Sequence, residues 1–167
     1  MTAGAERKKK GFFAFVHDWN KLSDLVTPRH HRKIALWLEG QCAGGDRRML
    51  LMAFRGAGKS SLVGLFAAWM LYQDPNRRLL VLAADMKLAK KMVRNVKRII
   101  ERHPDTKHLK PPAKERDQWA ADQFTVVRPQ ELRDSSMVAA GIGGNITGSR
   151  ADVVICDDVE VPRTSGS

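Results

Sequence analysis

The sequence predicts an α/β fold in which a mostly parallel sheet is covered by helices on both faces. Short apolar runs, each the length of a buried strand, alternate along the chain with segments long enough to be helices. One of these runs leads into a glycine-rich turn, and another ends in consecutive aspartates. Alternation of this kind is typical of parallel strands joined by helices, whose functional side chains gather at the carboxyl ends of the strands.

The first part of the chain is predicted to be helical. We expect residues 1–11 to form a flexible basic arm and residues 12–46 a helical lead-in, with helices at 12–22 and 29–39. The second helix begins after Thr27-Pro28, which reads as a cap followed by a first-turn proline. The remaining residues, 47–167, form the predicted α/β core.

The core is predicted from its apolar runs in chain order. Residues 49–54 read as a strand, and the helix expected at 61–71 is apolar around most of its circumference, so it should be buried against a sheet. A strand at 78–85 precedes a helix at 87–103, and a proline-containing loop follows. Further strands are predicted at 124–127, 137–140 and 153–156.

A phosphate-binding loop is predicted between the first strand of the core and the helix after it. Residues 53–60 read A-F-R-G-A-G-K-S, which matches the pattern G-x-x-x-x-G-K-[ST] at every fixed position except the first. Lys59 is expected to reach the β and γ phosphates of a nucleotide, and Ser60 to coordinate Mg²⁺. Ala53 replaces the first glycine and is tolerable if its backbone stays extended. The predicted nucleotide-binding residues are Ala53, Gly56, Ala57, Gly58, Lys59, Ser60 and Ser61.

The alternative interpretation of this segment is a glycine turn before a helix with a surface lysine. A second motif favours phosphate binding. In "SRADVVICDDVEVP" an apolar strand leads directly into Asp157 and Asp158, with Glu160 two residues further on. Asp157 is the candidate for holding Mg²⁺ through water, and Asp158 or Glu160 is the candidate base that polarises an attacking water. The simpler alternative is an acidic strand end that binds nothing.

Composition indicates a polyanionic partner. The chain carries 29 Lys and Arg against 18 Asp and Glu, a net charge of +11. Six cations form one stripe of the predicted helix at 87–103, and a stripe of this kind is more often a solvated helix face than a nucleic-acid contact. The six are Lys87, Lys90, Lys91, Arg94, Lys97 and Arg98.

Other classes of protein are not supported by the composition. Cys42 and Cys156 are the only cysteines, which suits a reducing compartment, and the five histidines show no metal-ligand spacing. No apolar run reaches the roughly 18 residues of a membrane span, so no membrane association is expected.

The motifs together resemble the ATPase domain of the large terminase subunit of tailed bacteriophages, most closely its podovirus branch. The resemblance rests on "FRGAGKSS", "VLAADMKLAKKMVRNVKRII", "GGNITGSRADVVICDDVEVP" and the lead-in "TPRHHRKIALWLEG". It implies a RecA-like P-loop NTPase fold and an ATP-driven motor that moves double-stranded DNA into a procapsid. It also implies ATP and Mg²⁺ as cofactors, a portal protein and a small terminase subunit as partners, a ring of identical subunits, and a location in the host cytoplasm.

The resemblance also suggests roles for residues outside the two main motifs. It implies that Arg55 acts on the γ-phosphate within the same subunit, because a planar, permanently charged guanidinium can neutralise charge on phosphate oxygens. Arg150 is a weaker candidate for contact with a neighbouring subunit. Phe15, Trp19 and Trp37 could stack on adenine, although aromatic residues at helical spacing more often belong to the core.

The chain departs from the family where it stops, at "VPRTSGS". It therefore looks like a truncated N-terminal piece in which the nuclease domain and the ATPase coupling motif are absent. Two other functions remain open at this point. One is a helicase-like DNA translocase, which would need a second RecA-like domain, and the other is a basic DNA-binding module with a vestigial P-loop.

Overall fold

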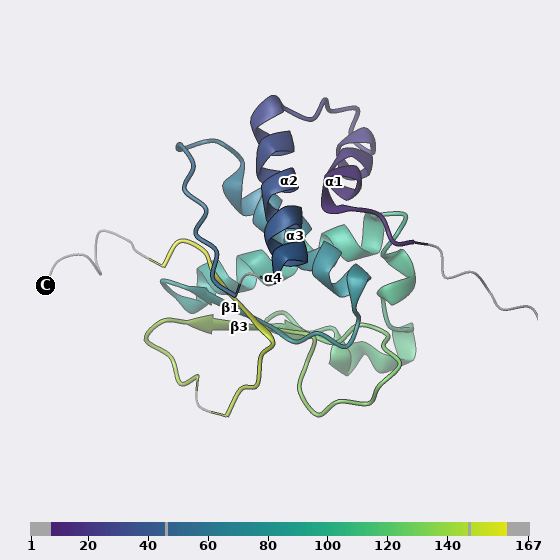
Figure 1. Cartoon of the computed structure of the whole chain (residues 1–167). Coiled ribbons are helices and arrows are strands. Elements are labelled where there is room, and N and C mark those ends of the chain that lie inside the picture. The colour runs from purple at the N-terminus through teal and green to yellow at the C-terminus, as the bar shows by residue number, and fades with distance from the viewer. Residues whose placement is uncertain (1–7, 46, 147, 160–167) are drawn as a thin grey trace, which may run out of the picture. The chain divides into compact units, whose positions relative to one another are not determined.

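The computed structural model describes residues 8–45, 47–146 and 148–159, and it divides the chain into two compact units, Met1–Ala57 and Gly58–Ser167. The division falls inside the predicted phosphate-binding loop. Most of the expected basic arm, and the candidate base Glu160, lie outside the described residues. Figure 1 shows the elements along the chain, and the two units are described separately below.

The first unit contains a pair of packed helices, α1 (Phe12–Lys21) and α2 (Arg29–Gly44) (Figure 1). The Glu39 carboxylate of α2 accepts a hydrogen bond from the backbone N–H of Phe13 at 3.3 Å. The Arg32 guanidinium lies 5.5 Å from the centroid of the Phe13 ring. Both predicted helices are confirmed, and α2 continues beyond its predicted end to Gly44, where Gly45 caps it with a φ of 75°.

The start of α2 differs from the expected cap. Pro28 occupies the N-cap position itself and supplies no side-chain hydrogen bond. The hydroxyl of Thr27 accepts a hydrogen bond from the Asn20 side chain at 2.9 Å, so it stabilises the connection between the two helices instead. Of the aromatic residues considered for adenine, Phe15 is completely buried, while Trp37 is exposed.

The predicted strand at residues 49–54 is wrong. This segment has no regular secondary structure, and its large side chains are open to solvent: Leu50 is 79% exposed and Met52 83%. An apolar run becomes a strand only when a neighbouring strand pairs with its backbone N–H and C=O groups. No described strand pairs with residues 49–54. Hydrophobicity alone therefore misidentified this segment.

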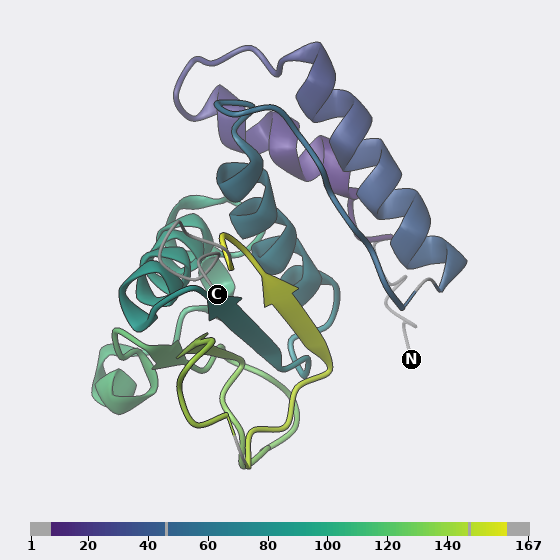
Figure 2. The same cartoon turned by 90° about the vertical axis from the view of Figure 1, so that its left-hand side faces the viewer.

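The second unit combines two long helices with a four-stranded sheet, whose strands lie in the order β2 (Gln123–Phe124), β3 (Met137–Gly141), β1 (Leu79–Ala83) and β4 (Val153–Cys156). The helix α3 (Lys59–Gln73) is followed by β1 and then by α4 (Met86–Arg102). The strands β3 and β4 both pair with β1 in parallel, with Leu79 opposite Met137 and Val153. Figure 2 shows β1 and β4 side by side and pointing the same way.

Packing in this unit follows the predicted pattern. The helix α4 lies on β1 and β3, and α3 lies on α4. The apolar stripe of α4 is buried, and α3 is buried along most of its length, as expected from its composition. The α/β class with a mostly parallel sheet is thus confirmed, while the covering of both sheet faces stays a prediction.

One predicted strand is shorter than expected. Only Gln123–Phe124 forms β2, antiparallel to β3, although the strand was predicted to reach Val127. The N–H of Val126 donates to the Ser136 hydroxyl, and the N–H of Val127 donates to the Leu109 carbonyl. Neither group therefore takes part in the pairing of β2 with β3. The loop before β2 also contains two 3₁₀ helices, Lys107–Leu109 and Ala113–Gln118.

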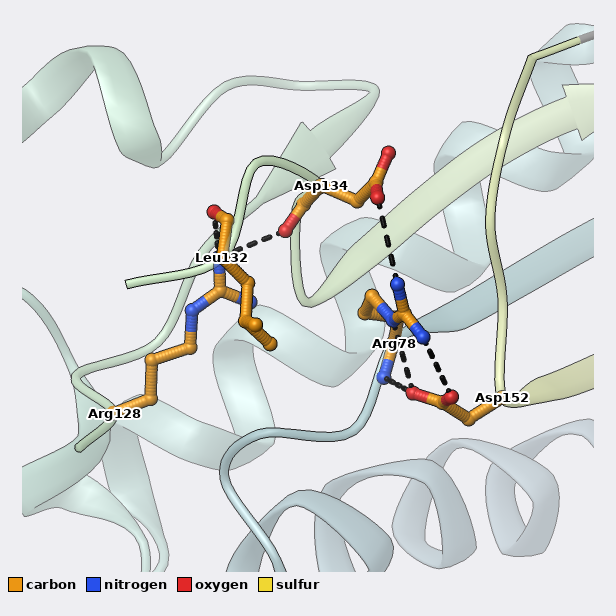
Figure 3. A network of polar contacts seen from close by, with 5 residues as sticks. All are labelled: Arg78, Arg128, Leu132, Asp134 and Asp152. Carbon is orange, nitrogen blue, oxygen red and sulfur yellow. Dashed lines mark hydrogen bonds and ion pairs between the residues drawn. The ribbon is translucent and has the colours of Figure 1, made fainter. Parts of the chain in front are cut away.

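An arginine fixes the ends of β1 and β4 where the two strands begin (Figure 3). Arg78 donates to the Asp152 carboxylate through its backbone N–H at 2.9 Å, its Nε at 3.1 Å and its Nη2 at 2.8 Å. The Asp152 N–H in turn donates to the Arg78 carbonyl at 2.8 Å, and a second carboxylate, that of Asp134, lies 3.5 Å from Nη1. These contacts set the register in which β4 leads to Asp157.

Among the described residues, no helix is both long enough and apolar enough to cross a membrane.

Candidate functional site

The glycine-rich turn has the backbone conformation that its glycines allow. Gly56 and Gly58 have φ values of 83° and 74°, in the region that residues with a Cβ rarely adopt. The N–H of Ala57 donates to the Phe54 carbonyl at 3.1 Å and closes the turn. Among the described non-glycine residues only Asp24 and Asp158 have a positive φ, so Ala53 does not adopt the left-handed conformation that favours glycine.

Two predicted metal-binding residues from distant parts of the chain lie together in the second unit. Ser60 is in the first turn of α3, and Asp157 directly follows β4. Ser60 and Asp157 line the same cleft, and hydrogen bonding from the Ser60 hydroxyl lowers the pKa of the Asp157 carboxyl. A hydroxyl and a carboxylate are oxygen ligands of the kind that Mg²⁺ prefers, and Mg²⁺ sites of nucleotide enzymes typically combine one or two carboxylates with phosphates and water. This donor set therefore fits Mg²⁺.

The Asp157 carboxyl is partly buried and is influenced by one positively and one negatively charged side chain. Burial raises the pKa of this carboxyl above the ordinary value of an aspartate. The hydrogen bond from Ser60 and the positive charge of Lys59 lower this pKa, whereas the negative charge of Asp158 raises it further. Ser60, Lys59 and Asp158 therefore all act on the Asp157 carboxyl.

Asp158 is held in an unusual backbone conformation. Its φ is 49°, in the left-handed region, and its carbonyl accepts a hydrogen bond from the N–H of Ala84 at 3.1 Å. The preceding residue, Asp157, donates its N–H to the Leu82 carbonyl at 3.0 Å. The chain is therefore tied to the carboxyl end of β1 at both aspartates, and the Asp158 side chain is exposed there.

A cleft of about 490 Å³ opens next to this pair of aspartates. Its walls are the first turn of α3, the end of β1, one side of α4 and the two residues after β4. The α4 residues recur at intervals of three or four positions, as in Leu88, Lys91, Asn95 and Arg98, so they share one side of the helix. The lining residues are Ser60, Ser61, Val81, Ala83, Leu88, Lys91, Met92, Arg94, Asn95, Arg98, Asp157 and Asp158.

The structure divides the predicted cationic stripe of α4. Lys97 donates to the Ala120 carbonyl at 2.6 Å and lies 5.8 Å from the Trp119 ring centroid, and burial lowers its pKa. Lys91, Arg94 and Arg98 line the cleft instead. We call these three residues the cationic ridge. The helical spacing was visible in the sequence, but which cations face the cleft was not, because this depends on the segments packed against α4.

The other predicted site residues are placed as follows. Gly56 and Arg55 are exposed residues of the first unit, and Ala57, its last residue, is buried. Arg150 precedes β4 whereas Asp157 follows it, so the two residues belong to opposite ends of that strand. Arg150 lines a separate hollow together with Arg133 and Asp134.

Comparison with known proteins gives two matches. A family model described as "RNA cytidine acetyltransferase NAT10/TcmA, helicase domain" matches residues 50–157. The terminase large subunit of Enterobacteria phage T3 is 34% identical over 160 residues, which covers 95% of this chain and 26% of that protein. The chain thus spans about a quarter of the length of this relative.

The matched region contains both motifs of the site. The family match begins just before the glycine-rich turn and ends at Asp157, which lines the cleft together with Ser60. The predicted resemblance to a terminase large subunit and the predicted P-loop fold class are therefore confirmed. The chain belongs to the P-loop family described as the helicase domain of RNA cytidine acetyltransferase NAT10/TcmA, and over nearly its whole length it is similar to the large subunit of a phage terminase.

Proposed function

We propose that this chain is the nucleotide-binding part of an ATP-hydrolysing motor of the terminase type. The observation that carries the proposal is that Ser60, in the first turn of α3, and Asp157, directly after β4, line the same cleft. A P-loop ATPase needs these two oxygen ligands side by side. The similarity to a terminase large subunit supports the same assignment.

The roles that we propose follow from the chemistry of each side chain. Lys59 binds the β and γ phosphates, with the amides of residues 56–60 around them, and Ser60 and Asp157 hold Mg²⁺. When bound, Mg²⁺ would neutralise negative charge on the phosphate oxygens while the γ-phosphoryl group is transferred to water. Ala53, at the first position of the glycine-rich pattern, and Ser61, directly after that pattern, are proposed to make the remaining nucleotide contacts. Arg55 is proposed to neutralise charge on the γ-phosphate.

Two carboxylates remain candidates for the base. Asp158 directly follows the proposed metal-binding aspartate, and its carbonyl accepts a hydrogen bond from the Ala84 N–H. Glu160 lies outside the described residues. We favour Asp158, since its backbone position is fixed beside the site, but neutralising each carboxylate separately is needed to assign the base.

We further propose that the motor moves double-stranded DNA into a procapsid. In this proposal the ATPase forms a ring of identical subunits and works with a portal protein and a small terminase subunit in the host cytoplasm. The support is the net charge of +11 and the cationic ridge of α4. Lys91 and Arg94 make no ion pair with any described carboxylate, so both are available to phosphate groups.

A second candidate is a helicase-like translocase. The word "helicase" in the description of the matching family favours it. A translocase of this kind would use the same nucleotide site as the terminase-type motor, but it would also require a second RecA-like domain. The third possibility considered, a DNA-binding module with a vestigial P-loop, predicts no nucleotide binding at all, so a binding experiment separates it from the other two.

The proposed nucleotide site is tested by calorimetry with Mg²⁺ and ATP. We expect Lys59→Ala to weaken binding by roughly 10- to 100-fold, because the change removes a charge-assisted contact worth about 1.5 to 3 kcal/mol. Ser60→Ala should reduce the dependence of affinity on Mg²⁺. Lys107→Ala is the matched control, since this lysine is exposed and belongs to a 3₁₀ helix that does not line the cleft. Equal affinity of the parent and Lys59→Ala would refute the proposal.

A further inference from the structure

Two adjacent histidines in the first turn of α2 contact the glycine-rich turn through a single oxygen atom. The Nε2 of His31 lies 2.7 Å from the carbonyl oxygen of Ala57, and the Nε2 of His30 lies 3.2 Å from the same oxygen. A carbonyl oxygen only accepts hydrogen bonds and has two lone pairs. Both imidazoles can therefore donate at once, each from a protonated Nε2.

The same histidines also lie against the beginning of the turn. The ring centroid of His30 is 5.4 Å from that of Phe54 and 4.6 Å from that of His31. Phe54 is the residue whose carbonyl accepts the N–H of Ala57 and closes the turn. The histidine pair thus contacts both ends of the four-residue turn. All of these residues belong to the first unit of the chain.

Holding the Ala57 carbonyl also orients the next backbone N–H. The Ala57 carbonyl and the Gly58 N–H belong to one planar trans peptide unit, so they point in opposite directions. Gly58 is also fixed on its other side, since its own carbonyl accepts a hydrogen bond from Leu62 at 3.0 Å. The direction of the Gly58 N–H is therefore determined by the oxygen that His30 and His31 hold.

Without this contact the peptide between Ala57 and Gly58 could rotate readily. Gly58 has no Cβ, so the steric barrier that restricts φ in other residues is missing. Rotation of the peptide would turn the carbonyl oxygen to the side where the N–H had been. A carbonyl facing a phosphate repels it, whereas an N–H donates a hydrogen bond to it.

We propose that His30 and His31 are positioning residues of the phosphate-binding loop. They hold the Ala57 carbonyl so that the Gly58 N–H is oriented for a nucleotide phosphate before the nucleotide arrives. This inference rests on the proposed function of the loop. A donor oriented in advance improves affinity, because the cost of ordering it is not paid on binding.

The test compares variants that keep the ring with variants that keep the donor. His30→Phe/His31→Phe retains two aromatic rings and removes both N–H donors, while His30→Phe/His31→Gln restores a donor at nearly the Nε2 position of His31. We expect the double phenylalanine variant to bind Mg²⁺-ATP about 3- to 10-fold more weakly than the parent, the loss expected when one hydrogen bond to the nucleotide, that of the Gly58 N–H to phosphate, is no longer oriented in advance. The glutamine variant should recover most of this loss.

A second measurement reports on the loop without nucleotide. Hydrogen exchange of the amides in residues 54–58 should be faster in the phenylalanine variant of the full chain and should return to the parent rate in the glutamine variant. If the double variants do not fold, the single changes His31→Phe and His31→Gln give the same comparison.

The outcomes separate this inference from the proposed function. Equal ATP affinity in the parent and the phenylalanine variant overturns the inference, and so does a glutamine variant that binds as weakly as the phenylalanine variant. If the parent itself binds no nucleotide, the proposed function fails, and the exchange rates alone then decide whether the histidines hold the loop.

Discussion

Asp152 and Asp157 stand at opposite ends of β4, and Arg78 holds the first of them. The Arg78 side chain lowers the pKa of the Asp152 carboxyl, chiefly by hydrogen bonding to it. Because the pKa is lowered in the folded state, ionised Asp152 stabilises the fold at pH values above about 4, the pKa expected in the unfolded chain. This stabilisation disappears as the pH falls through the folded-state pKa.

We therefore expect Asp152→Asn to lower the free energy of unfolding at pH 7. The effect should be smaller below about pH 4, because the Asp152 carboxyl of the parent then becomes protonated. Urea denaturation over this pH range measures the difference. The expected control is Asp134→Asn, which should cost less, since Asp134 contacts Arg78 through one pair of atoms at 3.5 Å. A pH-independent difference between the parent and Asp152→Asn would contradict the assignment.

Strand β3 and helix α4 approach each other closely where Gly141 ends the strand. A Cβ on Gly141 would lie 2.9 Å from the backbone nitrogen of Met86 and 3.2 Å from the carbonyl carbon of Asp85. These are backbone atoms at the start of α4, and the Asp85 carboxylate caps that helix by accepting the N–H of Leu88 at 2.8 Å. An added methyl group therefore requires backbone at the start of α4 or at the end of β3 to shift.

Gly141→Ala is expected to lower the free energy of unfolding by about 1 to 3 kcal/mol, the usual cost of overpacking. Gly143→Ala is a close control, because a Cβ there would meet nothing within 4 Å. We expect the control to change stability by less than about 0.5 kcal/mol. Urea denaturation of the two variants measures both values, and similar values would show that α4 can move without cost.

The whole molecule is strongly basic, and this charge leads to a prediction about DNA. We expect the chain to bind duplex DNA without sequence preference, with log K falling linearly with log[salt] by about 0.9 for each phosphate contacted. Changing the cationic ridge, Lys91, Arg94 and Arg98, to glutamate should weaken binding to all sequences alike. It should also make the slope shallower by up to roughly 0.9 for each phosphate that is no longer neutralised.

The control for this experiment carries the same change in net charge. Arg102, Lys107 and Lys114 are exposed cations that do not line the cleft. Changing these three to glutamate should leave the salt slope closer to that of the parent. Equal slopes for the ridge variant and the control variant would assign the DNA contact to another surface. Fluorescence anisotropy at several salt concentrations provides these slopes.

Local patterns in the sequence determined most of the secondary structure and pointed to a candidate site. The helices α1, α3 and α4 and the strand β4 follow from periodicity and apolar runs, because these depend on neighbouring residues alone. The glycine-rich turn and the paired aspartates likewise indicated a nucleotide site, since the chemistry of phosphate and Mg²⁺ restricts which residues can serve there.

Tertiary structure decided what depends on segments distant in the sequence. Residues 49–54 had the composition of a strand, but no described strand pairs with them. Lys97 shares the helical spacing of the cationic stripe, yet its ammonium group donates to the Ala120 carbonyl. Likewise, the contact of Ser60 with Asp157 and that of His31 with Ala57 join residues whose spacing in the chain carries no signal of proximity. Such contacts are set by packing and hydrogen bonding between elements, and the periodicity of a single segment cannot encode them.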